Sequence, residues 1–429
     1  MAAQVRAATA WTLFPMELKF AVIELLTTED IHSFSKASSE SYALCVPTLF
    51  KTVNLPCREA LQLFLAHVPK SYGRHIRSLS IRTLAADGRN GPVTESLSEL
   101  LEWCTQLEHL QLSLADSVRP SILSSFEKLR ALRELGISNC GDENSNPFVD
   151  TDLISRSERL VVSMAASLPK LSSLTLDRIA RSAMHAPELV GCNSFIPVCT
   201  GDNDIPAHPV FGQNLSLPVL LRLPNLRYLR IRDTHLGDTA WSTTPIMCSL
   251  EVLDLGSCYF ESPEFNRVCT ERIIGNVGNS VDEFSVSTPL KSDTFDFAKP
   301  ISTPLKRLRK VHLTPLLPVE NVVDTLTTLS GSPVEELSVS CHEDDMEDMC
   351  EALKGFLALR EERRDELYPR LTEISLKTVG DDLESVKGSM TFPVTSDVSQ
   401  CGGDEKPAVY QTPAPQAPLP RMGRSVRDM

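Results

Sequence analysis

The chain has 429 residues and a formal net charge of −14 at pH 7, with 42% hydrophobic and 23% charged residues. This length accommodates two or three ordinary domains, or one small module followed by a long repeat array. The acidic balance disfavours a general nucleic-acid or membrane-surface binder, because such proteins need a basic face to neutralise phosphates.

No targeting or membrane-spanning segment is predicted. The first apolar stretch, 11–26, is broken by Glu17 and Lys19 and lacks a basic leader. No run of about 18 uncharged apolar residues follows it. Twelve cysteines are scattered without a CxxC pair, so we expect reduced thiols and neither a metal nor a cofactor. The expected location is the cytoplasm, the nucleus or both.

Residues 11–55 are predicted to form a small helical module. A first helix begins near Pro15, and Leu18 starts its apolar stripe. A second helix follows, and residues 39–49 form a third, shorter helix that contains a proline. Residues 56–74 are predicted to be a linking helix. A module of this size has a thin core and usually needs a partner to cover its apolar face.

Residues 75–379 carry ten copies of one pattern of three apolar residues. Two residues separate the first apolar residue from the second, and one residue separates the second from the third. The last two apolar positions lie two apart, so in a strand both point into a core. Segments with helical periodicity, such as 93–104 and 319–329, separate the copies. The pattern predicts an α/β fold, a curved β/α solenoid with a parallel sheet. The copies begin at Ile76, Leu107, Leu132, Leu171, Leu226, Leu250, Val281, Leu308, Val334 and Leu371.

The copies are spaced irregularly, by 24 to 55 residues, so an ordinary α/β protein with leucine-rich strands is the alternative. The widest spacing predicts an insertion at about 177–215, which contains four prolines and little periodicity. Long loops of this kind are either functional or disordered. Because the insertion adjoins an arginine-rich copy, we expect it to form a lid over that strand.

The outward positions of the strands are predicted to form a binding surface. Most copies place Ser, Thr, Glu or Gln there, but the fifth and eighth copies are basic. Arginine clusters bind carboxylates and phosphates, and Arg with Tyr is typical of binding hot spots. We therefore expect an acidic or phosphorylated protein substrate to bind there; a hydrated strand face with ordinary charges is the alternative. The candidates are Arg222, Arg227, Tyr228, Arg230, Arg232, Lys310 and His312.

The two ends of the chain are expected to lie outside the folded part. Residues 1–10 are predicted to be flexible. The segment 380–429 is low in aromatic residues and rich in turn formers, so we predict a disordered tail. Its prolines between 413 and 420 leave open a role as a polyproline ligand.

No catalytic motif is present in the sequence, which lacks GxSxG, HExxH, P-loop and GxGxxG patterns. The densest polar cluster is Cys341-His342 with the acidic residues 343–345. It has the composition of a metal site, but acidic residues also favour the positive end of a helix. We expect a helix to start there, and we expect a protein that is not an enzyme.

The repeats resemble leucine-rich repeats of the longer, helix-containing kind. The variant with a cysteine or asparagine after the strand is matched by Leu250-x-x-Leu253-x-Leu255-x-x-Cys258 and by the copy ending at Cys140. In that family this side chain turns inward and helps to satisfy backbone groups in the turn. The other copies depart from it, so the array is degenerate.

Residues 11–53 resemble an F-box. The opening Leu-Pro-x-Glu-Leu of that family appears as Phe14-Pro15-Met16-Glu17-Leu18, and its final Leu-Trp as Leu49-Phe50. Glu40 is a departure, because basic residues are usual there. The stretch His75 to Ile81 is also similar to the first repeat of fungal F-box proteins with repeat arrays.

The resemblance implies a substrate receptor of an SCF-type cullin-RING ubiquitin ligase. F-box proteins dock on a Skp-type adaptor, and through it on a cullin, while the downstream domain binds a substrate protein. A non-catalytic repeat scaffold without a ligase role is the alternative. Some of the implied adaptor contacts are equally expected to fill the helical core. They are Pro15, Leu18, Val22, Ile23, Leu26, Ile31, Leu49 and Phe50.

Overall fold

The structure is a computed structural model that divides into two compact units, Met1–Pro393 and Val394–Met429. All described residues belong to the first unit; they are 11, 14–85, 93–115, 118–140, 157–191, 196–290, 305–363, 367–379 and 386–393. The predicted flexible N-terminus and most of the predicted tail therefore lie outside the described residues. Within the described ranges, no helix is both long and apolar enough to span a lipid bilayer.

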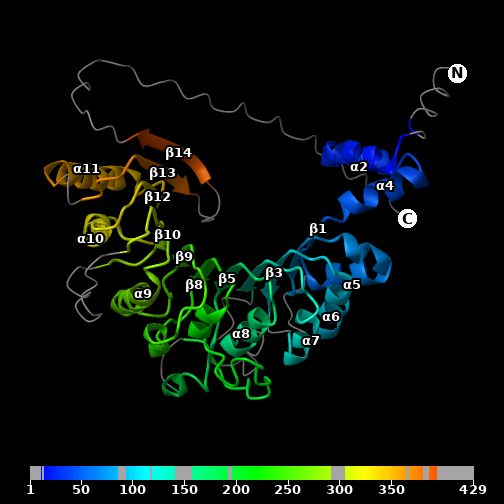
Figure 1. The fold of residues 1–429 in the computed structure, drawn as a ribbon, viewed down its shortest axis with the longest axis horizontal. Coiled ribbons are helices and arrows are strands. Elements are labelled where there is room, and N and C mark those ends of the chain that lie inside the picture. The colour runs from blue at the N-terminus through cyan, green and yellow to red at the C-terminus, as the bar shows by residue number, and fades with distance from the viewer. Residues whose placement is uncertain are drawn as a thin grey trace, which may run out of the picture. The chain divides into compact units, whose positions relative to one another are not determined.

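One twelve-stranded sheet runs through the first unit (Figure 1). Eleven strands pair in parallel, and each pairs with the next main strand along the chain. The twelfth, β14, pairs antiparallel with β13. The strands are β1 (Thr52–Leu55), β2 (Ser78–Arg82), β3 (His109–Leu114), β4 (Glu134–Asn139), β5 (Ser173–Asp177), β8 (Tyr228–Arg232), β9 (Val252–Leu255), β10 (Glu283–Val286), β11 (Lys310–Leu313), β12 (Glu336–His342), β13 (Glu373–Val379) and β14 (Val386–Pro393).

All ten predicted copies form strands, and their apolar positions are in register. The middle position forms one row from Leu79 to Ile374, and the last position forms a second row from Ile81 to Leu376. Every side chain in the two rows is at most 3% exposed. Burial of each stabilises the fold by about 1.5–3 kcal/mol, so these rows form the core of the sheet. The predicted α/β fold with a large parallel sheet is confirmed.

The first strand, β1, was not predicted. It follows the same pattern, because Val53 pairs with Leu79 and Leu55 pairs with Ile81. Phe50 occupies the first apolar position of this copy. The F-box resemblance had assigned Phe50 to the end of the helical module. The sheet therefore begins inside the segment 11–55 that was predicted to be helical.

Helices connect many of the neighbouring strands and lie on the outer side of the curved sheet (Figure 1). Their lengths differ: the spacing of 31 residues after Leu250 and that of 37 residues after Val334 hold the long helices α9 and α11, whereas the spacings of 24 and 25 residues hold short helical turns. The predicted helix after residue 345 is α11. The elements are α5 (Arg58–His67), η1 (Lys70–His75), α6 (Thr94–Trp103), η2 (Pro120–Ile122), α7 (Leu123–Phe126), α8 (Glu158–Ala166), η4 (Pro187–Leu189), η5 (Leu217–Arg222), η6 (Thr239–Ser242), α9 (Pro263–Val277), η8 (Val319–Asn321), α10 (Val322–Thr328) and α11 (Met346–Glu362).

In different copies, different side chains form the hydrogen bonds to the backbone of the turn after the strand. The Cys140 thiol donates to the carbonyl of Ser113 over 3.2 Å. Cys258 is buried, but the side-chain amide of Asn266 bonds both its N–H and its carbonyl, each over 3.0 Å. The inward cysteine that the resemblance implies is therefore present at Cys258, while an asparagine on α9 satisfies the backbone.

Three short helices precede the sheet, as predicted: α2 (Met16–Glu24), α3 (Thr28–Ser35) and α4 (Ser39–Leu49). Thr27 caps α3 by accepting from the N–H of Asp30, and Ser38 caps α4. Pro47 lies within α4, which continues to Leu49. The core of the cluster is small: among the described residues, its buried side chains are Ile23, Ile31, Leu44 and Cys45.

Aromatic side chains join this cluster to the first repeat. The Phe50 ring lies 5.0 Å from Tyr72 and 6.3 Å from Phe64, and Tyr42 lies 6.5 Å from Tyr72. The backbone is tied as well, because the N–H of Arg77 donates to the carbonyl that precedes β1. The cluster is therefore joined to the first repeat through α4 and Phe50, which pack against η1 and α5.

Alanine at position 73 is expected to destabilise the protein by about 1–3 kcal/mol. The added Cβ would lie 2.4 Å from Cβ of Trp103 and 2.7 Å from its carbonyl oxygen, so η1 and α6 would have to separate. Gly355→Ala in α11 is the matched control, since, apart from the adjoining turns of its own helix, no atom of the described residues lies within 4 Å of its new Cβ. That variant is expected to gain about 0.5–1 kcal/mol. Urea unfolding measures both, and equal effects would contradict this packing.

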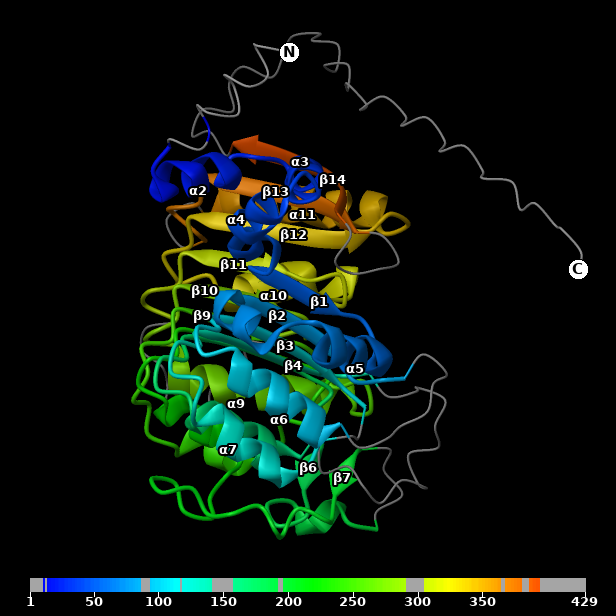
Figure 2. The same ribbon diagram turned by 90° about the vertical axis from the view of Figure 1, so that its right-hand side faces the viewer.

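The insertion lies in the helix layer, so the predicted lid over the arginine-rich strand is wrong for its described residues. Its two short strands, β6 (Arg181–Ser182) and β7 (Val198–Cys199), pair in parallel beside the helices (Figure 2). Arg159 of α8 donates to the carbonyl of Ile205 and, over 2.8 Å, to the side chain of Gln213. Buried hydrogen bonds therefore hold the insertion against α8.

Glu158, in the first turn of α8, is fully buried and anchors both ends of the insertion. It accepts hydrogen bonds from the N–H groups of Ser182 over 2.9 Å and Leu217 over 3.2 Å. Arg181 Nε and His185 Nδ1 lie 3.2 and 3.3 Å from its Oε1. Burial opposes ionisation, but the hydrogen bond from His185 and the charge of Arg181 outweigh it and lower the pKa of Glu158.

The chain also continues the sheet where a tail was predicted. Residues 380–385 and 394–429 lie outside the described residues, but β14 occupies 386–393 and pairs antiparallel with β13. β14 carries no copy of the apolar pattern. The open edge of β13 supplies its hydrogen-bonding partners, which sequence periodicity does not reveal.

Candidate functional site

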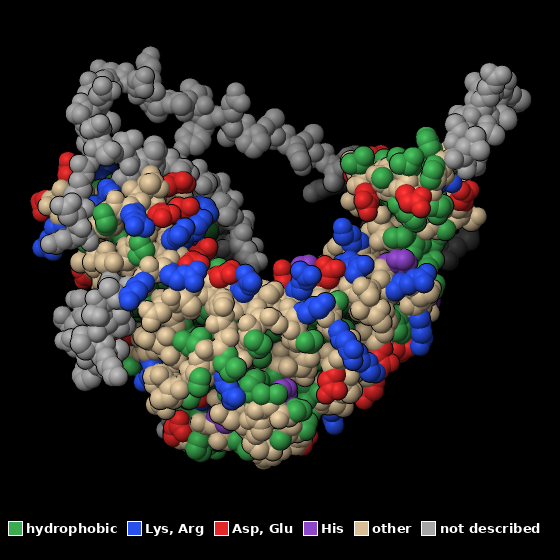
Figure 3. All heavy atoms as spheres, in the orientation of Figure 1, with side chains coloured by type: hydrophobic (Ala, Val, Ile, Leu, Met, Phe, Trp, Pro, Cys, Tyr) green, Lys and Arg blue, Asp and Glu red, His purple; other side chains and the backbone are tan. Residues whose placement is uncertain are grey.

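One face of α2 exposes large apolar side chains. Leu18 is 52% exposed, Val22 44% and Leu25 87%, and these residues lie three and four apart on one face of the helix. Phe14 and Met16, at 47% and 50% exposed, add exposed apolar area at the start of the helix. Figure 3 shows hydrophobic side chains gathered over α2. We call these five residues, with Pro15, the α2 face.

The predicted adaptor-contact residues fall into three groups. Pro15, Leu18 and Val22 are exposed on the α2 face. Ile23 and Ile31 are 0% and 6% exposed in the core of the cluster, so they are core residues and not contact residues.

The third group is partly buried inside the protein. Leu26 and Leu49 pack against the core of the cluster, and Phe50 packs in the aromatic junction with Phe64 and Tyr72. Sequence spacing alone did not separate these residues from the exposed ones. Conversely, Met16 and Leu25 are exposed but were not predicted as contacts, although Leu25 continues the i, i+3, i+4 spacing of Leu18 and Val22.

Glu40, the acidic departure from the F-box pattern, has a partner within the cluster. It accepts from Nζ of Lys19 over 3.0 Å, and the same ammonium lies 5.8 Å from the centroid of the Trp11 ring. Lys19 is only 4% exposed. A buried ammonium needs a compensating charge, so Glu40 stabilises the packing of α2 on α4.

The inner face of the sheet carries the outward residues of the strands, and its most charged part lies on β8 and β9. Arg230 Nε and Arg232 Nη2 lie 3.4 and 2.9 Å from Oδ2 of Asp254, whose side chain is 8% exposed. Burial and the charge of Asp254 raise the pKa of the neighbouring Tyr228. The structure therefore brings Tyr228, Arg230 and Arg232 together, but it places a carboxylate between the two arginines.

Asp254 is the residue that sequence reasoning missed here. It occupies the same repeat position as Arg230, and the two pair across the sheet. Once the strand register is known, the pairing of these two positions shows that Asp254 lies beside Arg230. One carboxylate serves two guanidinium groups, and Asp177 on β5 lies opposite Arg232 in the strand register, so the net positive charge here is smaller than the basic fifth copy suggests.

Arg227 and Lys310 do not join this cluster, whereas His312 lines a small pocket together with Arg232. Arg227 and Lys310 lie at strand starts, where Arg227 pairs with Glu251 over 2.7 Å and Lys310 with Glu336 over 2.6 Å. His312, on β11, is half-buried, and burial lowers its pKa, so it is mostly neutral near pH 7.

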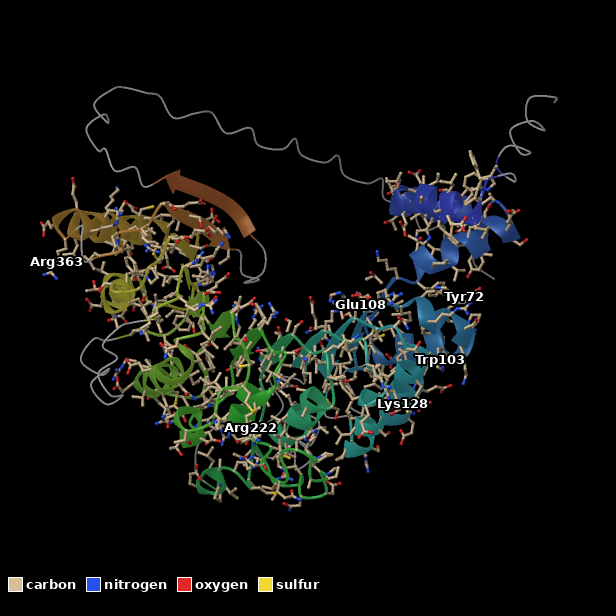
Figure 4. All side chains as sticks on the ribbon, in the orientation of Figure 1. Tyr72, Trp103, Glu108, Lys128, Arg222 and Arg363 are labelled. Carbon is tan, nitrogen blue, oxygen red and sulfur yellow. The ribbon has the colours of Figure 1, made fainter. Side chains whose placement is uncertain are left out.

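Arg222 lies on the other side of the sheet. It ends η5 in the helix layer, where its guanidinium stacks 4.9 Å from the centroid of the Phe211 ring (Figure 4). The prediction that Arg222 belongs to the patch on the strand face is therefore wrong. The helical turn that precedes β8 turns this side chain away from the inner face.

A groove of about 510 Å³ lies where the strands β9, β10 and β11 begin. Val252 and Pro333 provide apolar surface, and basic side chains dominate the rest of the lining. We call it the strand-start groove. Of its basic residues, only Lys310 was among the predicted site residues; Arg307 and Arg370 were not, because they lie outside the strand pattern.

Within the described ranges, no group of three His, Cys, Asp or Glu side chains is arranged to hold a metal ion. The Cys341–His342 cluster forms the end of β12 and the approach to α11. The chain matches no protein-family model and no curated protein.

Proposed function

We propose that this protein is the substrate receptor of an SCF-type cullin-RING ubiquitin ligase. In this proposal the three-helix cluster acts as an F-box that docks on a Skp-type adaptor, and through it on a cullin. The repeats act as leucine-rich repeats that hold a substrate protein. The exposed apolar α2 face is the observation on which the proposal rests.

The physical argument begins with exposed area. Each large apolar side chain that a partner covers contributes roughly 25 cal/mol per Å² removed from water. A contiguous set of such side chains on a soluble protein marks a protein interface or a membrane contact. The described core of the cluster has only four buried residues, so a partner on the α2 face would also reinforce a marginal unit.

The sheet supports the second half of the proposal. Its inner face carries one row that is polar except at Gly136, and this row runs from Ser80 through Arg230 and His312 to Ser375 on neighbouring strands. Curved parallel sheets of stacked repeats offer such rows as extended binding surfaces. An ordered surface of this kind suits a protein segment better than a small molecule, which prefers an apolar pocket.

The proposed role requires no bond chemistry from this chain. The receptor binds the substrate and the adaptor at the same time, which raises the concentration of substrate lysines near the ubiquitin thioester. The aromatic junction at Phe50 and Tyr72 favours this role, because it limits movement between the helical cluster and the sheet.

A repeat scaffold without a ligase role is the second candidate. The pairing of Lys19 with Glu40 favours it, because the acidic residue departs from the F-box pattern. The two candidates differ in one property, the affinity of the α2 face for a Skp-type adaptor.

Substituting glutamate at Leu18 and Val22 is expected to abolish capture of a purified Skp-type adaptor by the full-length chain. Two carboxylates in an apolar interface would lose their hydration, which costs far more than the burial contributes. The matched control is Leu63→Glu on α5, which is 59% exposed and lies outside the α2 face. Pull-down with recombinant adaptor measures the effect, and the control is expected to capture adaptor like the wild type. Adaptor capture that survives the double substitution, or is absent in the wild type, would favour the scaffold.

A further inference from the structure

We propose that the strand-start groove binds an acidic segment of another protein through carboxylate or phosphoryl groups. The proposal goes beyond the receptor role, because an acidic ligand can bind there whether or not the α2 face docks an adaptor. It also moves the expected anionic contact from the face of β8 to the edge of the sheet.

The groove gathers side chains from several repeats. Glu251 and Val252 come from the start of β9, Asp282 and Glu283 from β10, and a basic run from the approach to β11. Arg370 comes from the turn before β13. The parallel register brings these starts to one edge of the sheet, so a ligand lying across the groove contacts at least three units at once.

The charge in the groove is opposite to that of the whole chain. Its lining includes five basic and three acidic side chains, a surplus of two positive charges, whereas the full sequence carries −14. Figure 3 shows basic side chains along this edge, with acidic ones between them. A local field of this sign attracts acidic segments and repels the rest of an acidic surface.

The ion pairs show which of these charges are already compensated. Arg307 forms a two-pronged pair with Asp282, with both distances 3.1 Å. Lys310 pairs with Glu336 over 2.6 Å. The acid Glu251, for its part, is engaged by Arg227 outside the groove.

Three exposed cations are left over: Lys306, Arg309 and Arg370. Among the described residues, no acidic side chain lies within 4.0 Å of their charged nitrogens. Guanidinium groups bind carboxylates and phosphates in two-pronged geometry, so Arg309 and Arg370 are suited to hold two separate anionic groups.

The lining favours a protein segment over a nucleic acid. Glu283 and Asp282 stand among the cations, and a continuous chain of phosphates would meet them. Acidic groups spaced along a peptide can avoid these carboxylates, while Val252 and Pro333 contact an apolar side chain between them. The ligand class is therefore a peptide segment with separated acidic or phosphorylated residues.

The test measures the binding of four fluorescent probes to the full chain by anisotropy. Three are peptides of one glycine-serine backbone with spaced glutamate, phosphoserine or lysine residues, and the fourth is a single-stranded DNA oligonucleotide. We expect binding of the glutamate peptide, the phosphoserine peptide or both, and the stronger of the two identifies the source of the anion. Arg309→Glu with Arg370→Glu is expected to weaken that binding at least about tenfold, because each charge-assisted contact contributes more than 1 kcal/mol.

The matched control is Arg133→Glu with Arg130→Glu. Arg133 occupies the same repeat position as Arg309, and both control residues are exposed outside the groove. The control is expected to bind the acidic probe within about twofold of the wild type, since distant surface charges are screened by salt. Circular dichroism confirms that both variants are folded.

Three outcomes would overturn the proposal: no binding of either acidic peptide, an equal loss in both double variants, or tighter binding of the oligonucleotide than of the peptides. None of them bears on adaptor capture by the α2 face, which is measured separately.

Discussion

Replacing Glu158 by alanine is expected to lower the free energy of unfolding by about 3–5 kcal/mol. The substitution leaves Arg181, which is 1% exposed, with a buried charge and without its 3.2 Å partner. It also removes the acceptor of the N–H groups of Ser182 and Leu217, so the insertion loses one of its attachments to α8 and keeps that of Arg159. Urea unfolding followed by circular dichroism measures the change.

The exposed pair of Arg227 with Glu251 is the control for this prediction. Its side chains are 63% and 43% exposed, so Arg227→Ala is expected to cost at most about 1 kcal/mol. Comparable losses in the two variants would show that Glu158 does not anchor the insertion.

The acid response of Glu158 provides a second signature. Because folding lowers its pKa, the ionised carboxylate contributes stability that is fully present above its ordinary value of 4.5. That contribution is lost as the pH falls through the lowered pKa of the folded state. Glu158→Gln cannot titrate, so its unfolding free energy is expected to fall less steeply on acidification than that of the wild type.

Replacing Ile23 by alanine is expected to destabilise the three-helix cluster by about 2–5 kcal/mol. Ile23 is 0% exposed and is one of four buried residues in the described core of the cluster, so the substitution leaves a cavity in a small core. The cluster is then expected to open locally while the sheet, with its own core, stays folded. Hydrogen exchange measures this, as faster exchange over 16–49 with unchanged exchange in β2–β13.

The neighbouring residue provides the control. Val22 is 44% exposed on the α2 face, and Val22→Ala is expected to change the stability of the cluster by less than about 0.5 kcal/mol. Equal acceleration of exchange in the two variants would contradict the assignment of Ile23 to the core and of Val22 to the surface.

The ten predicted strands follow from a local rule. Two apolar residues two positions apart, such as Leu253 and Leu255, specify a strand with one buried face wherever they stand in the chain. Strand β1 obeys the same rule, but Phe50 had been assigned to the helical module, so its copy was missed. β14 has no such pattern and depends on the free edge of β13, which only the assembled sheet provides.

The site was harder to predict because its charges interact across the sheet. Arg230 and Asp254 are 24 residues apart in the sequence, and only the strand register brings them within 3.4 Å. From the sequence, Glu158 and Arg159 at the start of a helix would be expected to be exposed to solvent, because Glu and Arg are almost never fully buried unless they are paired. Their partners lie in an insertion without periodicity, so the sequence does not predict that these two residues are buried. For the same reason it does not predict that the insertion lies in the helix layer.

Hydrogen exchange of the full chain with and without a purified Skp-type adaptor tests the receptor proposal most directly. If the α2 face docks the adaptor, protection is expected to increase over 14–26 and to stay unchanged along β8–β13. Unchanged exchange across α2 at saturating adaptor, or protection confined to the sheet, would contradict it.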